Sequence, residues 1–381
     1  MTIIDAYTKE IVAYQAYDIG LTRGYFEPHG LGVSPDGRWI YLPTADGTVF
    51  GAEAVREGST GVEQLGLGRW LVIDARTLKL HQVVSTRGRP HHAKAIEGPH
   101  GEAWVLAYDF NWAGNNSLPG SGLYIFDPAN ENRVVGGIDG RRLQAMPYLS
   151  FKKPNSRYLW VGLPPPSFSD LAKELDGALA IVDMERWTVA KYLPMREDPI
   201  WVDFSADGRL AWVSNGGSDE VIKVNAVDGE WEVLSISRSA GHGPYGVRLN
   251  WEENQLWLID KGEGSHNRGV TISLVNPVTM TPQGNFATNC LRGDHITLHP
   301  DPDVNELWLS CNSSFEVVVF DPDARQVTAR IPMPSGGSTH SGAFVRYIVD
   351  EMGNWIGEVL SDQNGLHGSA LALKREILGL Q

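Results

Sequence analysis

The stretch from Pro28 to Tyr41, PHGLGVSPDGRWIY, sets the pattern for the whole chain. Its sequence predicts a short strand, a tight turn at Pro35-Asp36-Gly37 and a second strand from Trp39, because turn-forming residues separate two apolar runs. Six later stretches follow the same plan, each with a second strand rich in Trp, Tyr or Val. Their entrances lie at His91–His92, Tyr148, Ile200, Tyr245, Asp294–His295 and His340.

A second unit alternates with the first. It is a hydrophobic run that ends in Asp or Asn, followed by a turn and another strand. The Asp or Asn suits the turn because its side chain bonds the nearby backbone. The seven residues in this position are Asp5, Asp74, Asp127, Asp183, Asn225, Asn276 and Asp321.

Two strand pairs in each of seven repeats predict an all-β fold, a seven-bladed β-propeller with four-stranded blades. We expect residues 1–381 to form one such domain. The chain begins on the second unit, out of phase with the blades, so both termini should complete the last blade. Residues 368–373 are expected to supply a strand to that blade, and closure of this kind removes an exposed sheet edge.

The composition excludes several classes of partner. The chain of 381 residues has a formal net charge of −14 and is 42% hydrophobic, which argues against nucleic acid and anionic membranes. We expect a cytoplasmic protein, or a periplasmic one if a signal peptide has been removed, because no apolar run approaches the roughly 18 residues of a membrane span. For Cys290 and Cys311, two buried free thiols are favoured over a bridge.

The residue at the entrance of each first strand should lie nearest the propeller axis. On four neighbouring blades of the closed ring that residue is a histidine: His29, His92, His295 and His340. Neutral imidazole suits iron and copper, so the pattern predicts a four-histidine transition-metal site. Adjacent side chains of a strand point to opposite faces. In two of these blades, therefore, either of two neighbouring residues can be the one that faces the axis. His91 is the alternative to His92, and Asp294 can replace His295 as a ligand or orient a ligand histidine.

The opposite side of the channel carries aromatic residues, which predict a substrate slot. We expect Asp294, Tyr148 and Tyr245 to be the catalytic residues. The predicted substrate pocket comprises Trp201, Lys94, Trp112, Phe168 and His367, of which Trp112 and Phe168 belong to long insertions between strands. Four other histidines are expected at the surface: His81, His100, His266 and His299.

Several segments resemble the YVTN-type superfamily of seven-bladed propellers. They are HGLGVSPDGRWIYLPT from His29, IWVDFSADGRLAWVSN from Ile200, and the hairpins VIDARTLK and VFDPDARQV. The histidine-lined channel resembles those of metal-binding propellers, namely nitrous oxide reductase with copper and carotenoid cleavage oxygenases with ferrous iron. The haem d-type nitrite reductases bind their haem at a similar place. The resemblance implies the fold and a channel metal, but no particular reaction.

These features together predict an enzyme, a metal-dependent oxidoreductase that acts on a small molecule and uses iron or copper in the channel. A metal-dependent lyase or lactonase-type hydrolase in the same channel is the alternative, since a bound metal also polarises carbonyls. A metal-free propeller that serves as a binding platform is the second alternative.

Overall fold

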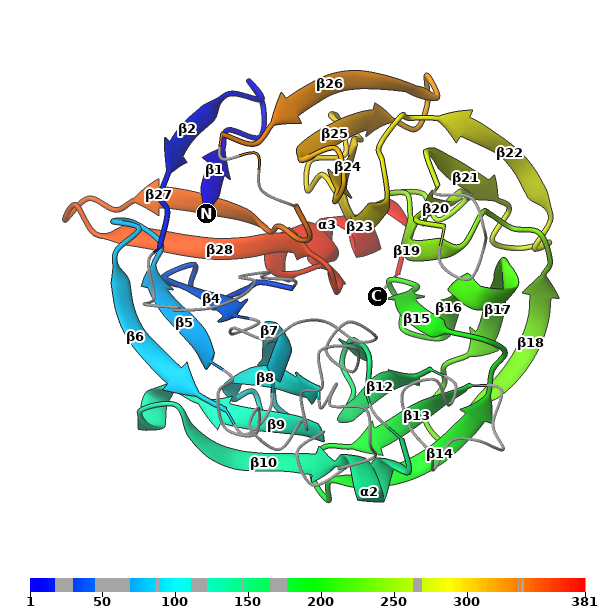
Figure 1. The fold of residues 1–381 in the computed structure, drawn as a ribbon, viewed down its shortest axis with the longest axis horizontal. Helices are drawn as coiled ribbons and strands as arrows, with labels where there is room; N and C mark the ends of the chain where they lie inside the picture. Colours follow the sequence, from blue (N-terminus) through cyan, green and yellow to red (C-terminus); the bar gives the residue numbers. More distant parts are fainter. Residues whose placement is uncertain are drawn as a thin grey trace, which may run out of the picture.

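Sheets of antiparallel strands are arranged radially around a central axis in the computed structural model, which is a seven-bladed β-propeller (Figure 1). Each complete blade has its first strand next to the axis and its fourth at the rim. The predicted all-β propeller is therefore confirmed. The structure describes residues 1–17, 30–44, 69–86, 89–110, 122–145, 147–164, 177–262, 269–334, 336 and 339–380.

The first three blades are four-stranded, and their strands follow one another in chain order. A short helix, α2 (Gly140–Leu143), joins the second blade to the third. The first two blades contain β3 (Gly32–Val33), β4 (Trp39–Thr44), β5 (Arg69–Asp74), β6 (Leu80–Ser85), β7 (Arg89–Glu97), β8 (Ala103–Phe110), β9 (Gly122–Asp127) and β10 (Arg133–Asp139). The third contains β11 (Ser150–Lys152), β12 (Tyr158–Leu163), β13 (Ala178–Asp183) and β14 (Thr188–Pro194).

The next three blades repeat the same four-stranded plan. The fourth contains β15 (Pro199–Phe204), β16 (Leu210–Asn215), β17 (Glu220–Asn225) and β18 (Glu232–Ser237). The fifth contains β19 (Pro244–Leu249), β20 (Leu256–Asp260), β21 (Thr271–Val275) and β22 (Pro282–Ala287). The sixth contains β23 (Gly293–Leu298), β24 (Leu307–Cys311), β25 (Glu316–Asp321) and β26 (Gln326–Pro332).

Both termini contribute to the seventh sector of the ring, as predicted, but as two separate sheets. One sheet holds β27 (Phe344–Val349), β28 (Trp355–Asp362) and β29 (Gly365–Leu366), and the other holds β1 (Thr2–Ile4) and β2 (Ile11–Tyr14). Side chains tie the N-terminal segment to both neighbouring blades. Lys9 Nζ donates to Glu306 Oε2 at 2.6 Å, and the Tyr17 hydroxyl donates to the Leu78 carbonyl at 2.8 Å.

The predicted turn chemistry is present in all seven repeats. Each of the seven Asp or Asn residues that were expected to form turns accepts a hydrogen bond from a backbone N–H two or three residues later. In the opening stretch, Asp36 Oδ1 accepts from the Arg38 N–H at 3.1 Å, and Gly37 has φ of +66°. That left-handed conformation favours glycine, which explains the Pro-Asp-Gly signature.

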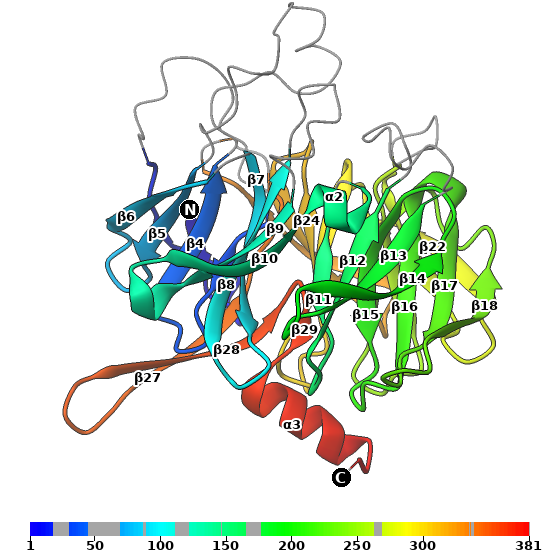
Figure 2. The same ribbon diagram turned by 90° about the horizontal axis from the view of Figure 1, so that it is seen from below.

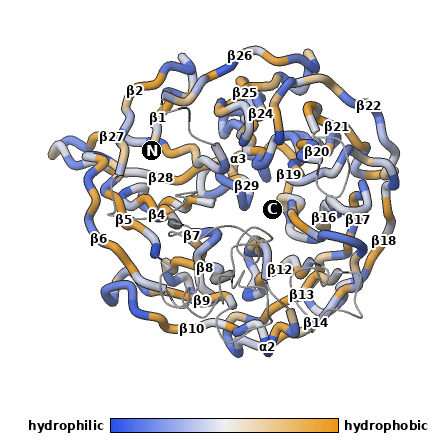
Figure 3. Tube along the Cα trace, in the orientation of Figure 1, coloured by the Kyte–Doolittle hydropathy of each residue, from blue (hydrophilic) through white to orange (hydrophobic). Residues whose placement is uncertain are grey.

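Apolar side chains fill the space between adjacent blades. Hydrophobic segments recur along the strands of the ring, whereas hydrophilic residues mark many of the turns (Figure 3). Five tryptophans are among the largest fully buried side chains, because aromatic residues bury large apolar areas between sheets. They are Trp70, Trp160, Trp201, Trp251 and Trp257.

Three predictions about local structure were wrong. Residues 368–373 belong to a helix, α3 (Gly368–Ile377), which lies beneath the ring (Figure 2); its Ala-Leu-Ala-Leu-Lys run has high helix propensity. Cys290 and Cys311 form a disulfide, because β23 and β24 pair Gly293 with Cys311 and so bring the two thiols together. His299 is buried, only 1% exposed, because it packs against Tyr7 and Phe344 in the seventh sector.

Candidate functional site

The first strands of four blades share an irregularity at their entrances. In each, two consecutive residues oppose a single residue of the second strand, which is a β-bulge. The paired residues are His91 and His92 against Tyr108, Ile200 and Trp201 against Ser214, Tyr245 and Gly246 against Ile259, and Asp294 and His295 against Ser310. A bulge breaks the alternation of faces, and this explains why neighbouring residues such as Asp294 and His295 are both buried at the channel.

Serine side chains opposite two of the four bulges hold them in place. The Ser310 hydroxyl accepts from the His295 N–H at 3.0 Å and also bonds the carbonyl of His340 in the next blade. Ser214 does the same between Trp201 and Tyr245, with distances of 3.1 and 2.5 Å. Sequence reasoning missed these serines, although each lies at the same place in its repeat.

Three of the expected metal ligands lie in one buried region, His92 and His295 at bulges and His340 ahead of β27. The His92 and His295 rings stack with centroids 5.5 Å apart, and His340 lies beside Asp294. All three histidines are at most 3% exposed. His91 turns toward Tyr148, with ring centroids 5.2 Å apart. His29 lies outside the described residues, but its neighbour Gly30 forms a parallel bridge with His92.

Two imidazoles of the cluster have unsatisfied nitrogens. Neither ring nitrogen of His92 nor of His295 has a hydrogen-bond partner among the residues that the structure describes. Burial lowers the pKa of His295 to about 3, against the opposing effect of Asp294, and burial also places the pKa of His92 well below its usual value. Both rings are therefore neutral at pH 7, and each keeps a lone pair for a ligand.

Asp294 forms the charged centre of the cluster. Its Oδ2 lies 2.6 Å from His340 Nδ1 and accepts from Asn312 Nδ2 at 2.9 Å, while Oδ1 lies 3.3 Å from Lys261 Nζ. Burial by itself would raise the pKa of this carboxyl, but Lys261, His295 and His340 together hold it far below its usual value. Asp294 is thus ionised and can only accept, so His340 Nδ1 donates to it.

Aromatic residues complete the walls of the cluster. The Tyr245 hydroxyl donates to the Tyr148 hydroxyl at 3.1 Å, and Lys261 Nζ lies 3.8 Å from the centre of the Tyr245 ring. Trp201 meets His295 edge-on, with centroids 4.8 Å apart. The structure therefore places the expected catalytic residues and Trp201 with the histidines. Lys261 and Asn312 were missed by sequence reasoning, because both follow second strands rather than strand entrances.

β28 turns into β29, which pairs with it, lies near the centre of the ring (Figure 3) and leads into α3 (Figure 2). We call residues Asp362 to His367 the plug. Arg248 donates to the carbonyls of Asp362 and Gln363, at 3.3 and 3.1 Å, and Gln363 Nε2 donates to the Leu31 carbonyl at 3.1 Å. These bonds connect the plug to the first and fifth blades.

Two residues of the expected substrate pocket lie at the plug: Lys94 bonds it from the second blade, and His367 is its last residue. Lys94 Nζ donates to the Ser150 carbonyl at 2.7 Å and to Asn364 Oδ1 at 3.3 Å, and burial lowers its pKa to about 7. His367 Nε2 lies 2.7 Å from Asp362 Oδ1. Burial opposes protonation of His367, but Asp362 raises the pKa above its usual value. The other two pocket residues, Trp112 and Phe168, lie outside the described part of the chain.

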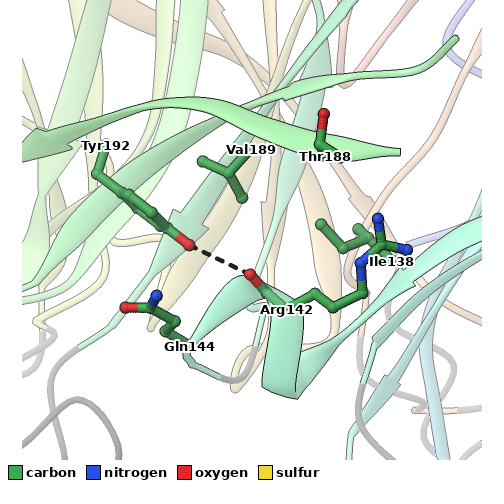
Figure 4. Close-up of a pocket in the computed structure, with 6 residues that line it drawn as sticks. All are labelled: Ile138, Arg142, Gln144, Thr188, Val189 and Tyr192. Carbon is green, nitrogen blue, oxygen red and sulfur yellow. Dashed lines mark hydrogen bonds between the residues drawn. The ribbon is translucent and has the colours of Figure 1, made fainter. Parts of the chain in front are cut away.

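A cavity of about 320 Å³ lies at the rim, between the second and third blades (Figure 4). The Tyr192 hydroxyl donates to the Arg142 carbonyl at 3.3 Å across it. No histidine, cysteine or carboxylate is among the six lining residues, so the channel cluster remains the candidate site. The lining residues are Ile138, Arg142, Gln144, Thr188, Val189 and Tyr192.

Comparisons with known proteins support the fold. No protein-family model and no curated protein matches the chain. Among solved structures, dihydro-haem d1 dehydrogenase NirN in complex with DHE is similar, with a TM-score of 0.54 and 16% identity over 87% of this chain. This chain covers 61% of the NirN chain, about three fifths of its length.

Two further structures are also similar to this chain. A functionally unknown protein from Desulfotomaculum acetoxidans matches with a TM-score of 0.57 and 11% identity, over 89% of this chain and 93% of its own. Kuenenia stuttgartiensis hydrazine synthase matches with a TM-score of 0.55 and 13% identity, over 90% of this chain and 99% of its own. Identities this low show a shared propeller architecture, because one fold serves many functions.

Proposed function

We propose that the channel cluster is the active site of an oxidoreductase that acts on a small molecule at an iron or copper ion. The observation that carries this proposal is the set of four imidazole nitrogens on His92 and His295 that are buried without a hydrogen-bond partner in the described residues. Burying a polar group without a partner costs on the order of 1–3 kcal/mol. A bound metal would offset that cost for one nitrogen of each ring, and imidazole is a good ligand for iron and copper.

The donor atoms fit such a metal, although the described side chains do not complete its coordination. No three His, Cys, Asp or Glu side chains in that part of the chain converge closely enough to hold an ion. His92 and His295 are therefore the proposed core of the site. His340 and His29, which the sequence places next to Gly30, are the proposed further ligands.

The surrounding residues would serve a reaction at this site in distinct ways. A bound iron or copper ion would supply electron transfer with the substrate. Asp294 orients His340 through the 2.6 Å contact, and Lys261 balances its charge. The hydroxyls of Tyr245 and Tyr148, 3.1 Å apart, would hold or pass a proton at the phenolic oxygens. Trp201 and Tyr245 shield the cluster from water.

A second candidate is a lyase or hydrolase that uses the His340–Asp294 pair as its acid–base group. The short contact between an ionised carboxylate and an imidazole is typical of a general base and its orienting residue. The 2.6 Å contact between His340 Nδ1 and Asp294 Oδ2 is the observation that favours this candidate. In both candidates the substrate is a small molecule, since the net charge of −14 disfavours nucleic acid and anionic membranes.

Metal content after reconstitution separates these candidates. The purified chain is loaded with ferrous or cupric ion, desalted and measured by elemental analysis. The oxidoreductase proposal expects close to one equivalent, lost in His92→Ala and His295→Ala and retained in His100→Ala, which alters an exposed histidine. Less than about 0.2 equivalents of either metal in the wild type would contradict it.

A further inference from the structure

The hairpin of β27 and β28 extends beyond the other blades (Figure 2). Its outer half exposes large hydrophobic side chains, which a monomeric protein rarely gathers in one projecting element. Between 38% and 83% of the surface of each of these residues is exposed. They are Tyr347, Ile348, Val349, Met352, Trp355 and Ile356.

Hydrogen bonds anchor the inner half of the hairpin to the rest of the molecule, and in the outer half the guanidinium of Arg76 lies 5.2 Å from the centre of the Trp355 ring. The Tyr347 hydroxyl donates to the Gly37 carbonyl at 2.7 Å on one face. On the other face Arg346 pairs with Glu358, and Glu358 Oε1 accepts from the Ser369 N–H of α3 at 2.7 Å. These contacts hold the hairpin in its outward direction.

Beyond these anchors, both faces of the ribbon are apolar. Val349 and Trp355 are paired across the strands on one face, and Ile348 and Ile356 on the other. Alternation of apolar and polar residues is expected for a ribbon with one face in water, and apolar residues on both faces are typical of a buried strand. An isolated two-stranded ribbon is only marginally stable in water, so this segment is suited to a partner.

The outer edge of β27 offers a place for that partner. β27 is the terminal strand of its sheet, and its only strand partner in the described structure is β28. A free strand edge readily pairs with another strand.

We propose that β27 pairs antiparallel with β27 of a second copy of this chain, about a two-fold axis at Ile348. In that register Ile348 faces its own counterpart, Tyr347 faces Val349, and Arg346 of each copy faces Asp350 of the other. Opposite charges thus meet at both ends of an apolar centre, which is the arrangement that stabilises cross-strand pairs. An isologous contact of this kind closes as a dimer.

The exposed side chains of β27 suit a dimer. Tyr347, Ile348 and Val349 lie on the pairing strand itself and are 38%, 54% and 60% exposed, so edge pairing would cover apolar surface as well as join the two backbones. A lipid bilayer is a poorer partner for the same residues. Asp350 and Glu351 lie at the hairpin tip, and hydrogen bonds from Asn354 and from the Met352 N–H keep the pKa of Asp350 below its usual value. The tip is therefore charged where insertion would begin.

Light scattering coupled to size exclusion tests the proposal on the full chain. The wild type is expected at twice the mass of one chain, and Ile348→Lys at half that mass, because two ammonium groups would face each other at the axis. Leu234→Lys is the matched control; Leu234 is 47% exposed on β18, so this variant should remain dimeric. A wild type that stays monomeric, or an Ile348→Lys variant that stays dimeric, would overturn the proposal.

A disulfide cross-link tests the register. Both natural cysteines are bonded to each other, so Ile348→Cys introduces the only free thiol. Mild oxidation should convert this variant to a covalent dimer and leave Leu234→Cys monomeric on non-reducing gels. Equal cross-linking of the two variants would contradict the two-fold axis at Ile348. Cosedimentation of wild-type monomer with phosphatidylcholine vesicles would identify a membrane as the partner and overturn the dimer.

Discussion

His340 Nδ1 lies 2.6 Å from Asp294 Oδ2, although the two residues are 46 positions apart and come from adjacent sectors of the ring. Both side chains are buried, and Asp294 also contacts Lys261 and Asn312. One carboxylate therefore connects a histidine, a lysine and an amide at the channel. The stability of the protein should depend on this carboxylate.

Asp294→Asn should destabilise the protein. The substitution removes the negative charge beside buried Lys261, and breaking a buried ion pair at one partner typically costs about 3–5 kcal/mol. Urea unfolding at pH 7 measures the change. Asp303→Asn alters an exposed carboxylate and is expected to change the free energy of unfolding by less than about 0.5 kcal/mol. Equal midpoints for the two variants would show that the Asp294 charge contributes little.

Gly30→Ala should disrupt the histidine cluster. A Cβ at Gly30 would lie 1.6 Å from His92 Nδ1, so the imidazole or the strand must move. We expect a loss of about 1–3 kcal/mol of stability, as for other overpacked sites, together with loss of bound metal. Gly342→Ala is the control, because its Cβ would meet nothing within 4 Å. Metal content and melting temperature of the two variants provide the comparison, and a Gly30→Ala protein that behaves like Gly342→Ala would contradict the described packing.

Arg248→Met should loosen the plug. Arg248 NH1 donates to buried Asp203 at 2.5 Å, and its other nitrogen bonds two plug carbonyls. Because the substitution leaves the Asp203 charge buried, we expect a loss of about 3–5 kcal/mol. The double variant Arg248→Met/Asp203→Asn should recover part of the lost free energy of unfolding, because the buried carboxylate charge is also removed. Arg133→Met removes an exposed arginine paired with Glu131 and should cost at most about 1 kcal/mol.

Amide hydrogen exchange in the plug gives a second measure of the Arg248 effect. Residues 362–367 should exchange faster in Arg248→Met than in Arg133→Met. Unchanged exchange there would show that other contacts hold the plug.

His299 should make stability sensitive to acid. Burial lowers its pKa below the usual 6.5, so between the unfolded and folded pKa values the unfolded chain binds more protons. The stability that His299 contributes is therefore present above about pH 6.5 and lost as the pH falls, by up to about 1.4 kcal/mol per pH unit.

Unfolding free energies at pH 7 and 5.5 measure this contribution. His299→Gln should lose less stability over that interval than the wild type does. His100→Gln, at an exposed position, should follow the wild type. If the His299→Gln protein shows the same acid sensitivity as the wild type, the buried ring does not titrate as expected.

Much of the fold could be predicted because its determinants are local. The turn at Asp36-Gly37 and the repeated Asp or Asn turns depend on backbone conformation and short-range hydrogen bonds. The seventh sector was harder to predict, because it depends on contacts between residues far apart in the sequence. His299 illustrates this: its neighbours Tyr7 and Phe344 come from opposite ends of the chain. The Cys290–Cys311 disulfide depends likewise on strand pairing rather than on spacing.

The candidate site was predicted in part. A periodic column of residues identified His92, His295 and His340, because every repeat presents its strand entrance to the same axis. The choice between His91 and His92, or Asp294 and His295, could not be made from alternation, since a β-bulge at each entrance buries both residues. Lys261 and Asn312 belong to other positions of the repeat, and only the packing of neighbouring strands brings them to Asp294.

The amino-acid sequence by itself thus determined the seven repeats, their turns and the ring of strand entrances. Those features follow from backbone preferences and from apolar residues that recur at a fixed period. The tertiary structure alone decided the bulges, the ionised Asp294 among its partners, the bonds between the plug and several blades, and the exposed β27 edge. Each of these depends on burial and on charges brought together from distant segments, and a local sequence pattern does not encode them.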